Sequence, residues 1–146
     1  MNTTDVKHLR TAIRVAQNAR EHGNHPFGAL LVNADGAVLL TAENTVETGR
    51  DCTGHAETNL VRLACGAYTA EQLAACTLYS STEPCAMCSG AIHWSGIRRI
   101  VFALGEHALY DIVGPSSEHL VLPCREVFSH TQRDVEIEGP CAELDA

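Results

Sequence analysis

The pattern of apolar and polar residues predicts a chain in which helices alternate with strands. Between residues 6 and 16 the apolar positions recur every three or four residues, which is the spacing of an amphipathic helix. We expect Thr4 or Asp5 to cap this helix and Gly23 to end it. The chain should therefore begin with a helix that packs one face against the rest of the protein.

A β-hairpin is expected next. Two short apolar runs, 29–32 and 38–41, flank an Asp35–Gly36 pair, and this dipeptide is typical of a tight turn between antiparallel strands. Residues 43–54 are polar and irregular, which indicates a surface loop or the rim of a pocket. A second helix should begin near His55 and end near Gly66.

The second half of the chain adds strands and one more helix. Segments 77–80 and 97–103 are predicted strands, and the unbroken apolar run in the second is typical of a sheet covered on both faces. Between them, residues 85–94 form a predicted helix. After residue 104 the periodic signal fades, and only 135–137 suggests a last strand.

This order of elements predicts an α/β fold, with three layers (α/β/α) and a mixed sheet of about five strands. The 146 residues are the size of one domain, so we expect residues 1–146 to form a single domain. No signal-peptide core or membrane-length apolar run is present, which favours a cytoplasmic protein.

Charge and cysteine content narrow the class of function. The formal net charge is −8 and the pI is near 5.4, whereas nucleic-acid binding usually needs a basic surface. We interpret the pair Arg98–Arg99 as solvated residues before a strand.

The cysteines have different predicted roles. Among the seven cysteines, Cys65 and Cys76 are predicted to be small buried hydrophobic residues. Cys52 lies three residues before His55 and is predicted to take no part in the chemistry.

The candidate chemistry lies in two short motifs. Cys85 and Cys88 follow Pro84 at a predicted helix start, so both sulfurs face one side where the helix dipole favours thiolates. His55 lies 30 residues upstream of Cys85, and Glu57 follows His55 by two residues. His–x–Glu followed by Pro–Cys–x–x–Cys is the signature of zinc-dependent base deaminases. The two motifs together are much more specific than either one alone.

These residues also carry a resemblance to a known family. The segments 26–29 (ProPheGlyAla), 55–57 (HisAlaGlu), 83–88 (GluProCysAlaMetCys) and 98–102 (ArgArgIleValPhe), together with Asn44, come in the order found in the cytidine deaminase-like superfamily. The sequence is most similar to the branch that holds guanine deaminases, tRNA adenosine deaminases and fungal-type cytosine deaminases.

The resemblance implies roles for individual residues. His55, Cys85 and Cys88 would be Zn²⁺ ligands, and Glu57 would be the proton shuttle. Candidate substrate-binding residues are Phe27, Asn44, Ala56 and Trp94, with the backbone amides of Ala56 and Cys85 near the bound base. Instead of binding substrate, Phe27 could pack in the core, and Asn44 could be a turn residue. For Trp94, a position in the core or on a dimer face is favoured over a substrate contact.

The resemblance also implies an activity. We expect a zinc-dependent hydrolytic deaminase of a small nucleobase or nucleoside, guanine-like because of the ProPheGly segment and the sequence at 91–94, acting as a homodimer. The alternatives are a tRNA adenosine deaminase, a cytosine deaminase, or a structural zinc protein with Cys52, His93 or Cys124 as fourth ligand. The C-terminal helix that often supplies a substrate contact in the family has no clear match.

Overall fold

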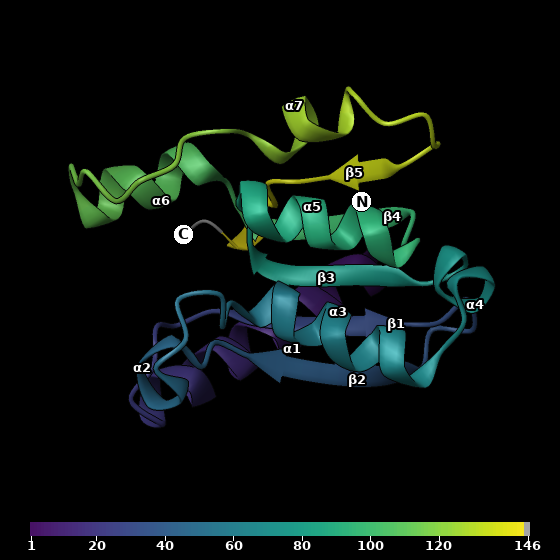
Figure 1. The fold of residues 1–146 in the computed structure, drawn as a ribbon, viewed down its shortest axis with the longest axis horizontal. Coiled ribbons are helices and arrows are strands. Elements are labelled where there is room, and N and C mark those ends of the chain that lie inside the picture. Colours follow the sequence, from purple (N-terminus) through teal and green to yellow (C-terminus); the bar gives the residue numbers. More distant parts are fainter. Residues whose placement is uncertain (145–146) are drawn as a thin grey trace.

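A computed structural model describes residues 1–144 and contains a five-stranded mixed sheet between two layers of helices (Figure 1). Strand order is β2-β1-β3-β4-β5; the first three strands pair antiparallel, and β3, β4 and β5 pair parallel. The strands are β1 (Gly28–Val32), β2 (Val38–Glu43), β3 (Thr77–Thr82), β4 (Arg99–Leu104) and β5 (Glu136–Glu138).

Helices cover both faces of this sheet. Helix α1 packs on one face, and α3 and α5 pack on the other, which confirms the predicted three-layer α/β/α fold (Figure 1). No described helix has the length and apolar character needed to cross a membrane. The helices are α1 (Thr3–Glu21), α2 (Val46–Gly49), α3 (Ala56–Ala67), α4 (Ala70–Ala74), α5 (Ala86–Ser95), α6 (Glu106–Val113), α7 (Cys124–Phe128) and the 3₁₀ turn η1 (Ala142–Leu144).

The first helix begins earlier than its apolar pattern indicates. Asn2, rather than Thr4 or Asp5, is its N-cap, because the Asn2 side chain accepts a 2.8 Å hydrogen bond from the Asp5 N–H. The Asp5 carboxylate in turn accepts a 3.0 Å hydrogen bond from the Asn2 N–H, which completes a capping box. Helix α1 lies so close to β1 that a Cβ on Gly28 would be 2.5 Å from the Ala12 carbonyl oxygen. Only glycine permits this approach.

Two details of α3 differ from the prediction. Cys65 is exposed, although it was predicted to be buried, and Leu63 is 52% exposed, whereas Leu60 and Ala64 on the same helix are buried. The helix continues through Gly66 to Ala67 before Tyr68 ends it. Directly afterwards comes α4, a short helix that apolar periodicity did not reveal, although its Thr69–Gln72 capping box is visible in the sequence. Cys76 is buried as predicted.

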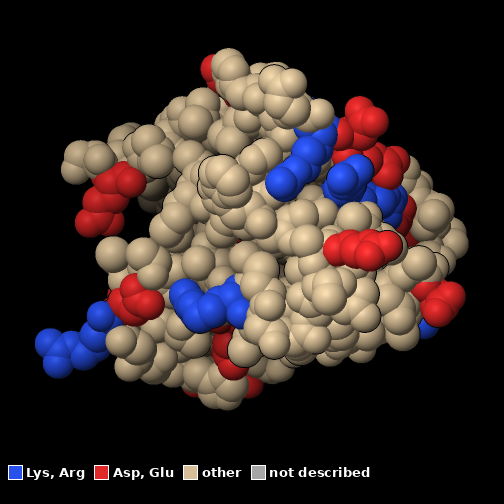
Figure 2. All heavy atoms as spheres, turned by 45° about the vertical axis from the view of Figure 1, so that its right-hand side comes forward, with Lys and Arg blue, Asp and Glu red and all other residues tan. Residues whose placement is uncertain are grey.

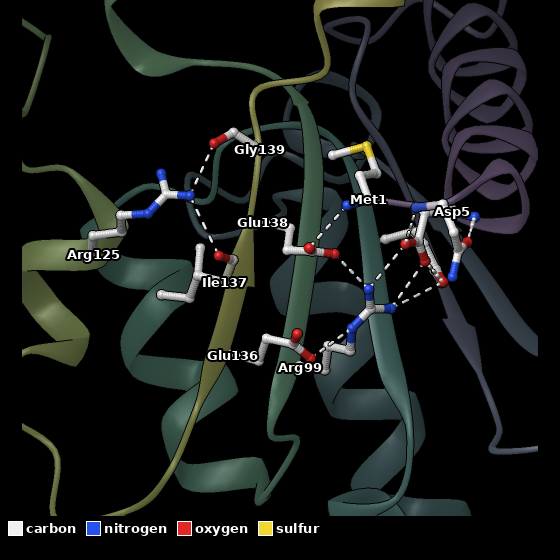
Figure 3. A network of polar contacts seen from close by, with 10 residues as sticks. Met1, Asp5, Arg99, Arg125, Glu136, Ile137, Glu138 and Gly139 are labelled. Carbon is white, nitrogen blue, oxygen red and sulfur yellow. Dashed lines mark hydrogen bonds and ion pairs between the residues drawn. The ribbon is translucent and has the colours of Figure 1, made fainter.

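Arg99 is part of an ion-pair network and not a solvated residue, which corrects the sequence interpretation (Figure 3). Its guanidinium donates to Asp5 at 2.9 and 3.0 Å, to Glu136 at 2.8 Å and to Glu138 at 2.6 Å. Burial alone would raise the pKa of Asp5, but hydrogen bonds from Arg99, Tyr79 and the Asn2 N–H hold it well below its usual range. The network joins α1, β4 and β5.

The strand directions bring several segments to one end of the sheet. Because β1 runs antiparallel to β2 and β3, its N-terminal end lies beside the C-terminal ends of those strands, and the C-terminal end of β4 follows. The loops that leave these ends lead into α2, α5 and α6, and Figure 1 shows α2 and α6 projecting at this end. Ligand sites in open α/β folds usually lie at such strand ends.

Candidate metal centre and base-binding cavity

A cavity of about 710 Å³ opens at this end of the sheet. One wall, from the hairpin side and α2, holds His25, Phe27, Asn44, Val46, Glu47 and Cys52. The floor holds His55, Glu57, Thr82, Glu83 and Cys85. The opposite wall, from α6 and the loop after it, holds Glu106, Leu109, Tyr110, Val113, Glu118 and His119.

The three predicted zinc ligands meet at the floor. His55 is the N-cap of α3 and Cys85 is the N-cap of α5, so Pro84 lies just before that helix and not in its first turn. The ligand atoms of His55, Cys85 and Cys88 all lie within 4.8 Å of one another. His55 Nδ1 is 3.5 Å from Cys85 Sγ and 3.6 Å from Cys88 Sγ, so Nδ1 is the nitrogen that faces both sulfurs.

The electrostatics of these three groups suit a cation. A hydrogen bond from the Cys88 thiol lowers the pKa of Cys85 to about 4, and the His55 ring acts in the same direction. The same bond, together with burial, raises the pKa of Cys88. The two sulfurs thus compete for one proton, and a divalent metal can take the place of that proton. Thr58 Oγ1 lies 3.2 Å from Cys88 Sγ, and this hydrogen bond helps to hold the Cys88 sulfur in position.

The donor set fits zinc in an open site. One nitrogen and two sulfurs are ligands that zinc prefers, and three protein ligands leave a fourth position free. That position faces the cavity, since His55 and Cys85 both line it. Cys52, His93 and Cys124, the candidates for a fourth structural ligand, all lie outside the cluster that the described residues form. The geometry is that of a catalytic site and not of a closed structural one.

Glu57 lies beside the metal ligands, in the first turn of α3, and is only 6% exposed. Burial raises its pKa to about 7, and the neighbouring Cys85 adds to the shift. Ser80 Oγ lies 3.1 Å from Glu57 Oε1 and 2.6 Å from the Thr82 carbonyl oxygen. These contacts fix the orientation of a carboxyl group that changes protonation easily near neutral pH.

The predicted substrate-binding residues fall into two groups. Phe27 and Asn44 line the cavity. The Asn44 Oδ1 atom accepts a 3.0 Å hydrogen bond from the Val46 N–H, and this bond holds the side-chain amide in one orientation. Ala56 is fully buried between His55 and Glu57 but does not line the cavity with its side chain. Trp94 is not part of the cavity lining. It is 80% exposed on α5, so neither a core position nor a contact with base in this cavity agrees with the structure.

The wall formed by α6 was not predicted from the sequence. Periodicity fades after Leu104, so the residue pattern predicts no helix in this segment. In the structure Glu106 lines the cavity, whereas His107 is exposed. The ring centroids of Tyr110 and His119 stack at 4.0 Å, which folds the loop after α6 back onto the helix. This stack has no signature in residue spacing.

Comparison with known proteins agrees with this geometry. Residues 2–104 match the model of the cytidine and deoxycytidylate deaminase zinc-binding region. The chain is 43% identical over 148 residues to the "Probable cytosine deaminase" of Schizosaccharomyces pombe, covering 100% of this chain and 90% of the relative. It is 46% identical over 100 residues to the guanine deaminase of Bacillus subtilis, covering 68% of this chain and 63% of that relative.

The fold is also similar to solved structures. One, from studies of A-to-I editing by tRNA:A34 deaminases, superposes with a TM-score of 0.70 at 29% identity over 92% of this chain and 98% of that chain. The family match, the relatives and the His–Cys–Cys site all agree with the resemblance drawn from the motifs. The chain therefore belongs to the cytidine and deoxycytidylate deaminase family and is a zinc-dependent hydrolytic deaminase.

Proposed function

We propose that this protein, as a single domain, deaminates a small free nucleobase and does not act on nucleotides or tRNA. The observation that carries this proposal is the charge of the cavity. Glutamates 47, 57, 83, 106 and 118 line it, while none of the lining residues that the structure describes is a lysine or arginine. Phosphate groups are normally bound by Arg, Lys or helix N-termini, so an acidic lining disfavours any substrate that carries them near the base.

The surface charge supports the same distinction. Figure 2 shows one face of the protein, where the Lys and Arg side chains are interleaved with Asp and Glu and form no broad basic area. The whole chain has a net charge of −8. A protein that reads an anticodon loop needs a salt-sensitive basic surface beside its site. The tRNA adenosine deaminase alternative is therefore the less favoured one.

The proposed mechanism assigns each residue of the floor a task. His55, Cys85 and Cys88 would hold zinc, which in such sites lowers the pKa of water toward neutrality and supplies a nucleophile. Glu57 would take the first proton of the attacking water and pass it to a ring nitrogen. It would then carry the remaining proton of the added hydroxyl group to the amine, which leaves as ammonia while the carbonyl bond forms. A buried carboxyl group with a pKa near 7 suits both directions of transfer. Phe27 would stack on the base, and Asn44 would hydrogen-bond its edge.

Two bases are candidates. The ProPheGly segment, residues 91–94 and the 46% identity to a guanine deaminase favour guanine. The 43% identity over the whole chain to a protein named as a probable cytosine deaminase favours cytosine, because that match includes the segment that forms the α6 wall. Both bases are free heterocycles with an exocyclic amine and no phosphate, so the class of substrate is the same.

An ammonia-release screen tests the proposal. The substrates are guanine, cytosine, adenine, guanosine, cytidine, dCMP and an anticodon stem-loop, each assayed with zinc-loaded protein. We expect turnover of guanine or cytosine and at most a tenth of that kcat/KM for dCMP and the stem-loop. Activity confined to dCMP or the stem-loop would contradict the proposal, and it would show that the acidic lining does not exclude substrates that carry phosphate.

Assembly and location are further parts of the proposal. A homodimer remains expected, but its interface cannot use Ile92, which is fully buried in the core, whereas Trp94 on the same helix is free to pack against another chain. Sedimentation at micromolar concentration tests the dimer, and a monomer in both the native protein and Trp94→Ala would refute it.

All seven cysteines are unpaired, which supports a reducing compartment such as the cytoplasm.

A further inference from the structure

One amide on the metal-binding helix holds the chain on both sides of Asn44. Asn59 lies in α3, one turn after His55, and its N–H donates to the His55 carbonyl oxygen at 2.9 Å. The Asn59 Nδ2 atom donates to the Glu43 carbonyl oxygen at 3.0 Å and to Thr45 Oγ1 at 2.9 Å. Glu43 and Thr45 are the two neighbours of Asn44 in the chain. Both hydrogens of a single amide group therefore bond within one residue of the side chain proposed to read the base.

The segment after β2 also packs directly against the residue that precedes His55. The Thr45 N–H donates to the Gly54 carbonyl oxygen at 2.8 Å, and Asn59 Nδ2 lies 3.4 Å from the same oxygen. A Cβ on Gly54 would be only 2.9 Å from Thr45 Oγ1, so a larger residue does not fit there. The position of the segment that carries Asn44 is thus set by contacts with α3 and with the approach to it.

Asn44 moves with this segment, because its own bonds are local. Its backbone N–H donates to the Phe27 carbonyl oxygen at 3.1 Å, and its Oδ1 atom accepts from the Val46 N–H at 3.0 Å. The residue is 2% exposed, so its side chain has little freedom to adjust by itself. The direction in which the remaining Nδ2 donor points is therefore decided by where the segment lies.

The residue type at position 59 agrees with a tertiary role. Asparagine is a poorer helix former than alanine, since its side chain competes for backbone hydrogen bonds, and Asn59 lies within the 12-residue helix α3. The Asn59 side chain is half-buried and directs its NH₂ group away from its own helix, to residues 43 and 45. These long-range bonds offset the lower helix propensity.

We propose that Asn59 is a positioning residue that fixes the Asn44 amide relative to the zinc ligands, and with it the ring edge that Asn44 binds. Asn59 is not among the residues that line the cavity, so it acts through Asn44 and not on the base. The inference rests on the proposed function and deepens it. Reacting groups must be held closely in register, and a misplacement of about 1 Å can lower a rate about 100-fold.

A mutant cycle between Asn59→Ala and Asn44→Ala tests this role. The two single variants, the double variant and wild type are loaded with zinc, and kcat and KM are measured for guanine and for cytosine. Zinc content and urea unfolding check that each protein is folded. Asn18→Ala is the matched control, because Asn18 is an exposed asparagine inside α1 and undergoes the same change in helix propensity.

We expect Asn59→Ala to lower kcat/KM about tenfold in the native background, the effect of about 1.4 kcal/mol of lost hydrogen bonding. Part of the loss should be in kcat, since the ring is held in a poorer position. In the Asn44→Ala background the same substitution should change kcat/KM less than twofold, because the side chain through which it acts is gone. An equal factor in both backgrounds would indicate a merely structural role and would overturn the proposal.

Hydrogen exchange provides a readout that does not depend on turnover. In zinc-loaded Asn59→Ala, the Asn44 and Thr45 amide hydrogens should exchange about five- to tenfold faster than in wild type and in Asn18→Ala, because local opening becomes easier. Thr45→Val removes only one of the two acceptors and keeps the branched shape, so it replaces Asn59→Ala if that variant does not fold. Unchanged exchange at both amides would refute the positioning role.

The two readouts separate this proposal from the proposed function. Faster exchange in Asn59→Ala, with no ammonia released from guanine or cytosine by wild type, would refute the proposed function and leave the link between α3 and residues 43–45 intact. Turnover by wild type with equal effects of Asn59→Ala in the two backgrounds would refute the positioning role alone.

Discussion

The Glu83 Oε1 atom accepts a 2.9 Å hydrogen bond from the Glu106 backbone N–H, which ties the metal-binding segment to the opposite wall of the cavity. The other oxygen of the same carboxylate accepts a 2.8 Å bond from the Cys124 N–H. Glu83 therefore positions the starts of both α6 and α7. It lies two residues before Cys85, so this side chain links the segment of the zinc ligands to the α6 wall.

Replacing Glu83 by Ala should weaken both stability and substrate binding. Two backbone N–H donors lose a charged acceptor, at a cost of about 1.5–3 kcal/mol for each bond. We expect a lower free energy of unfolding in urea and a raised KM, while zinc content stays near one per chain. Glu126→Ala is the control, because Glu126 is an exposed carboxylate on α7. Unchanged KM together with unchanged stability would show that the tie between the walls is unimportant.

Glu57→Gln should retain fold and zinc but lose nearly all turnover. General acid–base catalysis contributes about 10²–10⁴-fold, and Glu57 would serve several proton transfers in one cycle. Single-turnover ammonia release measures the loss. Ser80→Ala is informative beside it, since removing the 3.1 Å contact leaves the carboxyl group in place but less well oriented, and a smaller loss of kcat is expected. Near-native ammonia release by Glu57→Gln would disprove the shuttle role.

Cys88→Ala should lose zinc. Cys88 is fully buried in the ligand cluster, and two remaining ligands hold a zinc ion far less tightly than three. Metal analysis after dialysis should give well below one zinc per chain, together with lost activity and a lower Tm, since a ligand that binds only the folded state stabilises it. Cys65→Ala, an exposed thiol away from the site, is the control. Stoichiometric zinc in Cys88→Ala would contradict the ligand assignment.

Asp5→Asn should destabilise the protein at neutral pH but much less in acid. Removing one partner of a buried ion pair typically costs about 3–5 kcal/mol, and Asp5 is 2% exposed. Because the pKa of Asp5 is lower in the folded than in the unfolded protein, its contribution is complete above the unfolded pKa of about 4, begins to fall below it, and is lost only as pH falls through the much lower folded pKa. The difference in unfolding free energy between wild type and variant should therefore shrink below about pH 4.

Glu136→Gln provides the matched control for this prediction. Glu136 pairs with the same Arg99 guanidinium, but its side chain is 60% exposed, and exposed pairs contribute only about 0–1 kcal/mol. Urea titrations at pH 7 and at about pH 2.5, well below the unfolded pKa of Asp5, give both differences. An equal effect of the two substitutions at pH 7 would mean that burial of Asp5 does not determine the strength of the network (Figure 3).

The sequence by itself determined the metal centre and the layers of the fold. His55 and Cys85 are helix N-caps, and Cys88 follows within one turn, so local spacing fixes which side chains face the same point once the two helices are adjacent. Alternating helices and strands then leave few ways to bury the apolar faces, and the three-layer sandwich with five strands follows. These features depend on apolar residues that recur every two positions in strands and every three to four positions in helices, and the sequence shows both patterns directly.

Tertiary structure decided the rest. Glu106, Tyr110 and His119 come to the cavity because Glu83 anchors α6 and because an aromatic stack folds the following loop back, and neither contact leaves a periodic trace. Arg99 has the pattern of a solvated residue, and only the tertiary structure shows that two distant segments, α1 and β5, place carboxylates around it. Trp94 follows the apolar pattern of its helix but faces outward. Long-range contacts between irregular segments set these positions, and spacing along the chain carries no information about them.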